Sequence, residues 1–141
     1  MQLLGLGWAD ADVNIIRKTA LALLAEQRPD GGWAQIPGVE SDAYATGQAM
    51  VALMTAGAVS AANPAWHRGT AFLLRTQLDD GSWLVRSRSF PFQPYKESGF
   101  PHGKNQWISA AGTSWAAWAL ALGQPPAKVP ELPTRSTNAL E

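Results

Sequence analysis

The chain has 141 residues, which is enough for one domain with a modest hydrophobic core. Its 11 basic and 11 acidic residues give a net charge of zero, so it lacks the basic excess that favours nucleic-acid binding. It contains no cysteine and only two histidines, which excludes disulfides and thiolate zinc sites. We therefore predict no metal centre, no cofactor, no nucleic-acid partner and, for want of a long apolar run, no transmembrane span.

The first segment with helical periodicity covers about residues 13–26, with Asp12 as its expected N-cap. The stretch before it, residues 3–8, resembles the end of an earlier helix. Apolar side chains of the 13–26 segment share one face, and charged ones lie off that face. The residues on this face are Ile15, Ile16, Thr19, Leu23 and Leu24. We predict an amphipathic helix with one solvent-facing side.

The second predicted helix covers about residues 42–56 and is small or apolar almost all the way round. Ser41 is its expected N-cap and Gly57 its expected end. Because so few of its side chains are polar, we expect this helix to be buried.

The third predicted helix starts after Asn63 as N-cap, with Pro64 in its first turn, and its basic residues lie opposite its apolar ones. The fourth covers about residues 106–122, has no charged residue and ends at Gly123. Charged helices thus alternate with uncharged ones along the chain.

One short phrase occurs twice, with a spacing of fifty residues. Its members are Gln27, Asp30, Gly31 and Trp33 in the first copy, and Gln77, Asp80, Gly81 and Trp83 in the second. Each copy follows a helical run, and the Asp-Gly pair indicates a tight reversal of the chain. Glutamine and tryptophan at such a turn are best interpreted as structural, since their side chains pack and donate hydrogen bonds.

The order of these elements predicts an all-α fold of two αα-hairpins, at about 13–57 and 63–123, each with an outer charged helix and an inner uncharged one. The inner helices align at an offset of 67, so the second hairpin carries an insertion, an irregular loop at about 86–105. Residues 124–141 form a Pro-rich tail.

Residues 68–83, RGTAFLLRTQLDDGSW, resemble the QW repeat of squalene-hopene and oxidosqualene cyclases, and residues 18–33 resemble a degraded copy. The resemblance implies that residues 1–123 belong to the α/α-toroid shared by terpenoid cyclases and protein prenyltransferase β subunits. In that fold, inner helices surround a cavity. Two hairpins make only a partial ring, so we expect a C-terminal fragment whose partners are the remaining repeats of a longer chain, or a further copy of itself.

The resemblance also implies where an acid would stand. Bacterial cyclases of this family take the initiating proton from an Asp-x-Asp-Asp-Thr-Ala motif at the start of an inner helix. Aligning Thr46 with the motif threonine places Asp42 on the first aspartate and Tyr44 on the proton donor. The donor is therefore absent, and the prenyltransferase zinc set is excluded for lack of cysteine. If the parent protein is an isomerase or lyase of the cyclase type, its acid comes from other repeats.

Three side chains remain as weak catalytic candidates: Asp42, Tyr44 and His102. A wider set combines polar or aromatic character with a place near the expected cavity end or in the insertion. Its members are Thr46, Gln48, Arg86, Arg88, Tyr95, Glu97, Trp107 and Trp115. They could line a site for an apolar, isoprenoid or other small ligand, or they could cap and pack.

Two functions are compatible with these residues. The first is a terpenoid-cyclase-like segment that contributes structural repeats and cavity wall, supported by the many aromatic side chains. The second is a non-catalytic toroid module that binds a ligand or a protein on its concave face, supported by the missing donor and the polar insertion.

Overall fold

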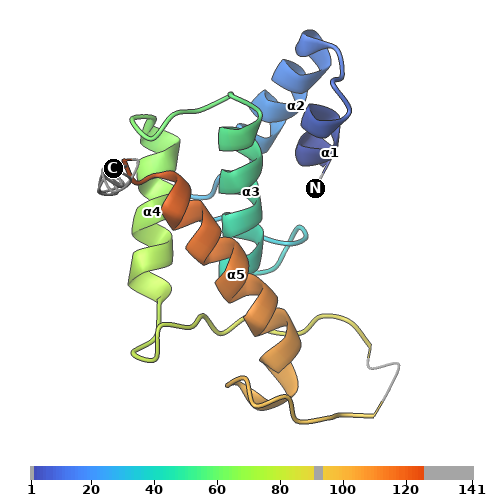
Figure 1. The fold of residues 1–141 in the computed structure, drawn as a ribbon, viewed down its shortest axis with the longest axis vertical. Coiled ribbons are helices and arrows are strands. Elements are labelled where there is room, and N and C mark those ends of the chain that lie inside the picture. The colour runs from blue at the N-terminus through green and yellow to red at the C-terminus, as the bar shows by residue number, and fades with distance from the viewer. Residues whose placement is uncertain (1, 91–93, 126–141) are drawn as a thin grey trace, which may run out of the picture.

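A computed structural model describes residues 2–90 and 94–125 (Figure 1). The prediction of a Pro-rich tail falls almost wholly outside these residues, as does part of the insertion. All regular structure in the described part of the chain is helical, which confirms the all-α prediction.

Five α-helices and one 3-10 turn follow one another in the described residues. They are α1 Gln2–Trp8, α2 Val13–Ala25, α3 Ala43–Thr55, α4 Pro64–Thr76, η1 Gly103–Asn105 and α5 Gln106–Leu122. The four predicted helices are confirmed to within a residue or two of their expected ends. Helix α1 confirms that residues 3–8 are helical.

The starts of α2, α3 and α4 are set by side-chain caps. Asp12 accepts the N–H of Asn14 at 2.8 Å, and Asn63 accepts the N–H of Ala65 at the same distance. For α3 the sequence prediction was wrong by one residue, because Asp42 rather than Ser41 is the N-cap. The Ser41 hydroxyl instead donates to the Asp30 carboxylate at 3.1 Å.

The inner helices α3 and α5 lie against each other along most of their lengths (Figure 1). A glycine makes this approach close: a Cβ on Gly47 would lie 2.7 Å from the backbone nitrogen of Ala116. Helix α4 packs on α3, and α1 contacts both α2 and α3. The fold is thus two αα-hairpins of an α/α-toroid, with α1 beside the first inner helix.

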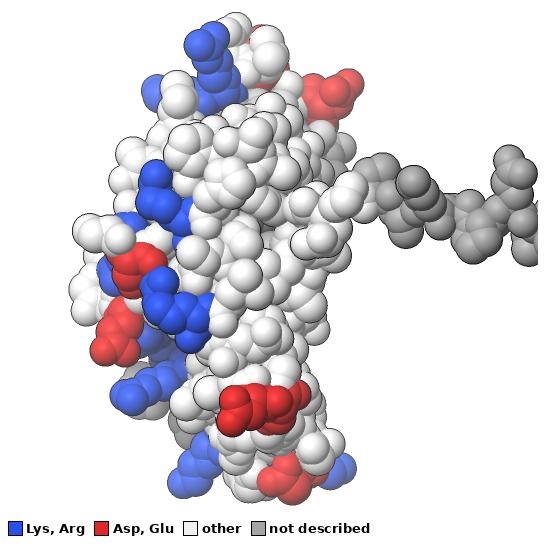
Figure 2. Space-filling model, turned by 90° about the vertical axis from the view of Figure 1, so that its left-hand side faces the viewer, with Lys and Arg blue, Asp and Glu red and all other residues white. Residues whose placement is uncertain are grey.

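The hydrophobic core is built largely from α3, where Met50, Val51 and Leu53 are almost completely inaccessible. The basic residues of the outer helices are exposed, as predicted. Figure 2 shows the face on which α4 lies, with basic and acidic groups down one margin and at both ends and a largely uncharged middle. The contrast between outer and inner helices therefore follows the charge pattern of the sequence.

Two apolar side chains of the amphipathic and uncharged helices are exposed. Ile15, assigned to the buried face of α2, is 52% exposed, and Trp118 on α5 is 44% exposed. Trp118 aligns with Val51 of α3, which is fully buried. Within the described residues, no further helix covers the side of α5 that carries Trp118.

No helix in the described part of the chain is both long and apolar enough to cross a bilayer.

Candidate functional site

The first turn of the repeated phrase is held by the Gln27 side chain. Its amide nitrogen donates to the carbonyl of Gly31 at 2.9 Å and to the carbonyl of Ala65 in α4 at 2.8 Å. The Arg68 guanidinium donates to its amide oxygen. One glutamine therefore closes its own turn and joins the first hairpin to the outer helix of the second.

The backbone of the first turn lies directly against α4. Gly31 has a φ of +89°, and a Cβ there would lie 2.4 Å from the carbonyl oxygen of Arg68. Any larger residue would be strained and would also collide with the helix. The Arg75 guanidinium donates to the carbonyl of Asp30 at 2.9 Å, so a second arginine of α4 binds the same turn.

Trp33 fastens the turn to both helices of its hairpin. Its indole N–H donates to the carbonyl of Leu23 at 2.8 Å, and its backbone N–H donates to the Thr46 hydroxyl at 2.9 Å. Thr46 was a candidate ligand-lining residue, but it is fully buried and lies outside the cleft described below. Its hydroxyl accepts the hydrogen bond from the Trp33 backbone and so stabilises the turn.

The second turn repeats these contacts in detail. The Gln77 amide donates to the carbonyl of Gly81 at 3.0 Å, and the Trp83 indole donates to the carbonyl of Leu73 at 2.9 Å. The backbone N–H of Trp83 donates to the Thr113 hydroxyl at 3.1 Å. Gln77 is exposed, because in the described residues no outer helix lies on this turn as α4 lies on the first.

His102 joins the insertion to the second turn. Its Nε2 lies 2.8 Å from the Ser82 hydroxyl oxygen, which in turn donates to the Asp80 carboxylate at 2.6 Å. That hydroxyl bond, the Ser82 backbone N–H and the nearby imidazole lower the pKa of Asp80. Because Ser82 gives its proton to Asp80, Nε2 is the donor to Ser82. The aspartate binds the serine and not the histidine, so the cluster is not a nucleophile–base arrangement.

A half-open cleft of about 370 Å³, here called the hairpin cleft, opens beside the first hairpin. Its lining comes from α2, the segment after the first turn, and α3. The lining residues are Leu23, Glu26, Trp33, Ala34, Gln35, Ile36, Tyr44, Ala45, Gln48, Ala49 and Ala52. Tyr44 and Gln48, both sequence candidates, therefore lie in one place, whereas Asp42 does not line the cleft.

Asp42 is occupied by structural contacts. One carboxylate oxygen accepts the N–H of Ala45 at 2.8 Å, and the other accepts the Gln35 amide at 2.7 Å. In the second hairpin, Ser109 stands at the aligned position of α5 and binds the backbone of Val85 at 3.0 and 3.2 Å. Asp42, the N-cap of α3, and Ser109, in the first turn of α5, thus each bind the residue that lies two positions beyond the turn tryptophan.

The polar candidates of the insertion do not form a common site. Arg86 and Arg88 are exposed, and no hydrogen bond of their side chains is present among the described residues. Tyr95 donates its hydroxyl to Glu97 at 2.5 Å, which raises the pKa of Tyr95 and lowers the pKa of Glu97. Both side chains lie on the surface, away from the hairpin cleft.

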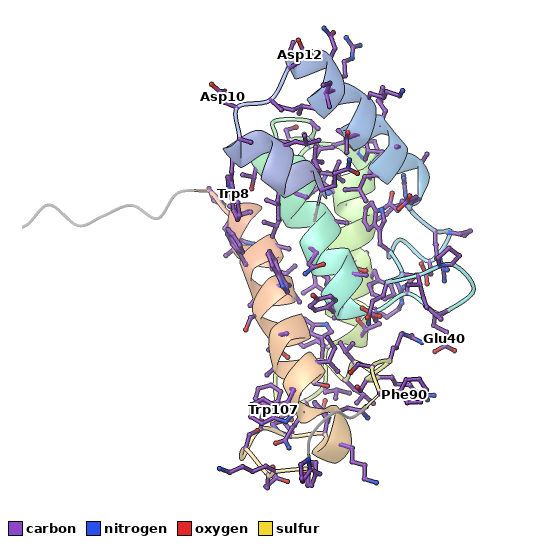
Figure 3. The ribbon with its side chains drawn as sticks, turned by 90° about the vertical axis from the view of Figure 1, so that its right-hand side faces the viewer. Trp8, Asp10, Asp12, Glu40, Phe90 and Trp107 are labelled. Atoms are coloured by element: carbon purple, nitrogen blue, oxygen red, sulfur yellow. The ribbon has the colours of Figure 1, made fainter. Side chains whose placement is uncertain are left out.

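The aromatic candidates lie on α5. Trp107, near the start of α5, is 61% exposed. Figure 3 places it near the lower end of the molecule. Trp115 is half-buried and stacks on Trp118, with ring centroids 5.3 Å apart and an interplanar angle of 19°. It is the one stacked aromatic pair among the described residues.

Sequence reasoning missed several residues that matter here. Gln35 and Glu26 line the hairpin cleft, and Gln106 is fully buried at the start of α5. The Gln106 side chain binds Ser98 and donates to the carbonyl of Lys96 at 2.6 Å. The available signal for this contact was a glutamine at the first position of a helix that has no charged residue.

The geometry defines a class of protein: a helical-hairpin repeat protein whose turns are fastened by glutamine and tryptophan. The family model of the squalene-hopene cyclase C-terminal domain matches residues 1–105. The chain is also 34% identical, over 121 residues, to a squalene–hopene cyclase of Bradyrhizobium diazoefficiens. It belongs to the squalene-hopene cyclase C-terminal domain family.

The match with the Bradyrhizobium cyclase covers 78% of this chain and 17% of that enzyme. The chain therefore spans about a sixth of the length of this relative. No solved structure matches the chain.

Proposed function

We propose that this chain supplies structural repeats and part of the cavity wall of a cyclase-type ring, and that it brings no proton donor of its own. The observation that carries the proposal is at the start of α3. Tyr44 stands at the donor position of the family motif, and both oxygens of Asp42 bind neighbouring protein groups. An acid that starts a cyclisation must present its proton to an apolar cavity.

The wall function is supported by the stacked pair Trp115–Trp118 on the inner helix α5. Indole faces attract cations, and each such contact contributes about 0.5–2 kcal/mol, depending on how dry the site is. A cavity that guides carbocations needs this property. Trp118 keeps 44% of its surface accessible, so a ligand can reach the pair.

The alternative is a non-catalytic module that binds an uncharged ligand or a protein on the same surface. The polar insertion and the half-open hairpin cleft favour this second function. The two proposed functions can be told apart by a binding measurement. A wall that stabilises cations binds a positively charged ligand more tightly than an uncharged one of the same shape, whereas the non-catalytic module does not.

The test is a comparison of two probes with the same alkyl chain, one ending in trimethylammonium and one in a hydroxyl, both below micelle concentration. Quenching of tryptophan fluorescence reports binding. We expect the ammonium probe to bind between about two-fold and thirty-fold more tightly, the range that cation–π attraction allows.

Two variants locate the effect. Trp118→Leu should remove the charge preference, whereas Phe90→Leu, on the surface of the insertion, should leave it intact. Equal affinity for both probes in the unmodified protein would favour the binding module. A preference that survives Trp118→Leu would place the cation elsewhere and contradict the assigned wall.

A further inference from the structure

A small notch lies where α4 begins and α5 ends, two parts of the second hairpin that Figure 1 shows side by side. It is half-open and holds about 150 Å³. At about 30 Å³ for each water-sized group, it has room for about five non-hydrogen atoms. Its walls come from the early turns of α4, the end of α5 and Ala61 in the loop before α4. The notch shares no lining residue with the hairpin cleft.

The notch contains a buried hydrogen-bond donor that the fold does not use. Trp66 is 5% exposed, yet its indole N–H donates to no other described residue, whereas the indoles of Trp33 and Trp83 each donate to a carbonyl. Every side-chain nitrogen or oxygen atom that is sealed from solvent in the described residues has a hydrogen-bond partner. The Trp66 nitrogen is therefore not sealed, and it opens into the notch that its ring lines. A buried donor of this kind is costly unless an acceptor reaches it.

Gly123 keeps the side of the notch next to this nitrogen open. A Cβ at Gly123 would lie 2.9 Å from Nε1 of Trp66 and 3.2 Å from Cζ2. The φ of Gly123 is −82°, which any residue can adopt, so the backbone conformation does not require glycine here. The close approach of the indole is what excludes a side chain. Any larger residue at this position would fill the notch beside the nitrogen.

Two further polar side chains of the notch are unused within the described residues. Thr70 stands one helical turn after Trp66, and its hydroxyl binds no described group, although Thr76 and Ser114 each donate to the carbonyl four residues earlier. The Gln124 side chain likewise has no hydrogen-bond partner in the part of the chain that the structure describes. A hydroxyl and a carboxamide can both donate and accept, whereas the indole can only donate.

We propose that the notch binds a small uncharged carbonyl compound, a short-chain carboxamide. Its carbonyl oxygen accepts from the indole N–H of Trp66, and its amide N–H groups donate to the Thr70 hydroxyl and the Gln124 side-chain oxygen. The apolar lining residues contact its alkyl part. A carboxylate fits less well, because no lysine or arginine lines the notch and His67 is exposed to water. The end of α5 also carries the negative pole of a helix, which disfavours an anion.

The test uses propionamide and propionate, which have equal numbers of non-hydrogen atoms and differ in charge. Each is titrated into the full chain, and proton–nitrogen correlation spectra follow the indole N–H signals. A Trp66→Phe variant identifies the signal of Trp66. We expect propionamide to move this signal downfield in a saturable way, because a hydrogen bond forms at the nitrogen. It should bind about tenfold more tightly than propionate, or better. The signals of Trp33 and Trp83, whose N–H groups already donate to carbonyls, should stay in place.

Three variants locate the binding site. Gly123→Ala places a methyl group against the indole nitrogen and should weaken propionamide binding about tenfold or more. The matched control is Gly5→Ala in α1, where no atom lies within 4 Å of an added Cβ, and it should change the affinity by less than about twofold. Thr70→Val keeps the shape of the side chain but removes the acceptor for the amide N–H, so it should weaken binding by about two- to tenfold.

A Trp66 signal that does not respond to propionamide would overturn the proposal. So would tighter binding of propionate, which would make the notch an oxyanion site. Affinity that Gly123→Ala leaves unchanged, with the Trp33 and Trp83 signals showing an intact fold, would also contradict it.

The outcome is separable from that of the proposed function. Binding of the alkyl-trimethylammonium probe reports on Trp118, which does not line the notch. Loss of the charge preference with a retained response of Trp66 to propionamide would leave the carboxamide site intact.

Discussion

The hydroxyl of Thr46 accepts the backbone N–H of Trp33 at 2.9 Å, and both groups are buried. Thr113 and Trp83 repeat the bond at 3.1 Å in the second hairpin. A threonine in each inner helix therefore accepts a hydrogen bond from the backbone N–H of the turn tryptophan. Without it, that donor would be buried without a partner. This bond explains why a hydroxyl recurs in helices that are otherwise almost apolar.

Replacing Thr46 with valine keeps the shape of the side chain and leaves the Trp33 N–H unpaired. We expect the free energy of unfolding to fall by about 1–3 kcal/mol. Thr46→Ser retains the hydroxyl and should lose less. Urea denaturation followed by tryptophan fluorescence measures both variants. A valine variant as stable as the serine one would show that the bond contributes nothing.

The two glutamines of the turns should differ in importance. Gln27 joins its turn to α4, whereas the Gln77 amide binds only its own turn within the described residues. Gln27→Leu should cost about 1–3 kcal/mol because it breaks contacts with two elements, and Gln77→Leu should cost about 1 kcal/mol or less. Thermal or urea unfolding measures the stability of both variants. If Gln27→Leu and Gln77→Leu lower the free energy of unfolding by similar amounts, the two glutamines do not differ in importance.

Two helical glycines should respond in opposite directions to alanine. No atom would lie within 4 Å of a Cβ on Gly5 in α1, so Gly5→Ala should stabilise the protein by up to about 1 kcal/mol. Gly47→Ala should destabilise it by about 1–3 kcal/mol, because the methyl group meets the backbone of α5. Denaturation midpoints give the sign of each change. Stabilisation by both would show that α3 and α5 do not pack as closely as described.

Acid should weaken the second turn. The pKa of Asp80 is lowered chiefly by the Ser82 hydroxyl, so this group stabilises the fold above the unfolded pKa of about 3.9. The contribution is lost as the pH falls through the lower, folded pKa. Asp80→Asn should therefore be less stable than the unmodified protein at pH 7, and the two should converge toward pH 2. A stability difference that is constant over this range would contradict the charge-based origin.

Much of the fold could be predicted because the helix pattern and turn chemistry are local. The spacing of apolar residues gave the helices, and the Asp-Gly pairs gave the reversals at Gly31 and Gly81. The α3 cap was misplaced because Ser41 and Asp42 are both good caps, and their choice depends on Gln35, which binds Asp42 across the loop. Local sequence carries no record of that contact.

The candidate site was predicted less completely. Tyr44 and Gln48 were placed near a cavity, but the cleft they line also depends on Ile36 and on the way the segment after the turn folds back. The hydrogen bond between Ser82 and His102 joins residues 20 positions apart across an irregular loop. The periodic spacing of apolar residues, which predicts helices, does not predict such a contact. Exposure of Trp118 depends on whether another helix covers α5, which is a tertiary property.

The central structural claim is that the first turn fastens one hairpin to the next through Gln27 and Arg68. A double-mutant cycle with Gln27→Leu and Arg68→Leu measures it directly, by the unfolding free energies of the four proteins. We predict a coupling energy of about 0.5–2 kcal/mol, the range for residues in one hydrogen-bond network. A coupling within about 0.3 kcal/mol of zero would mean that the two side chains act independently, and would contradict the account.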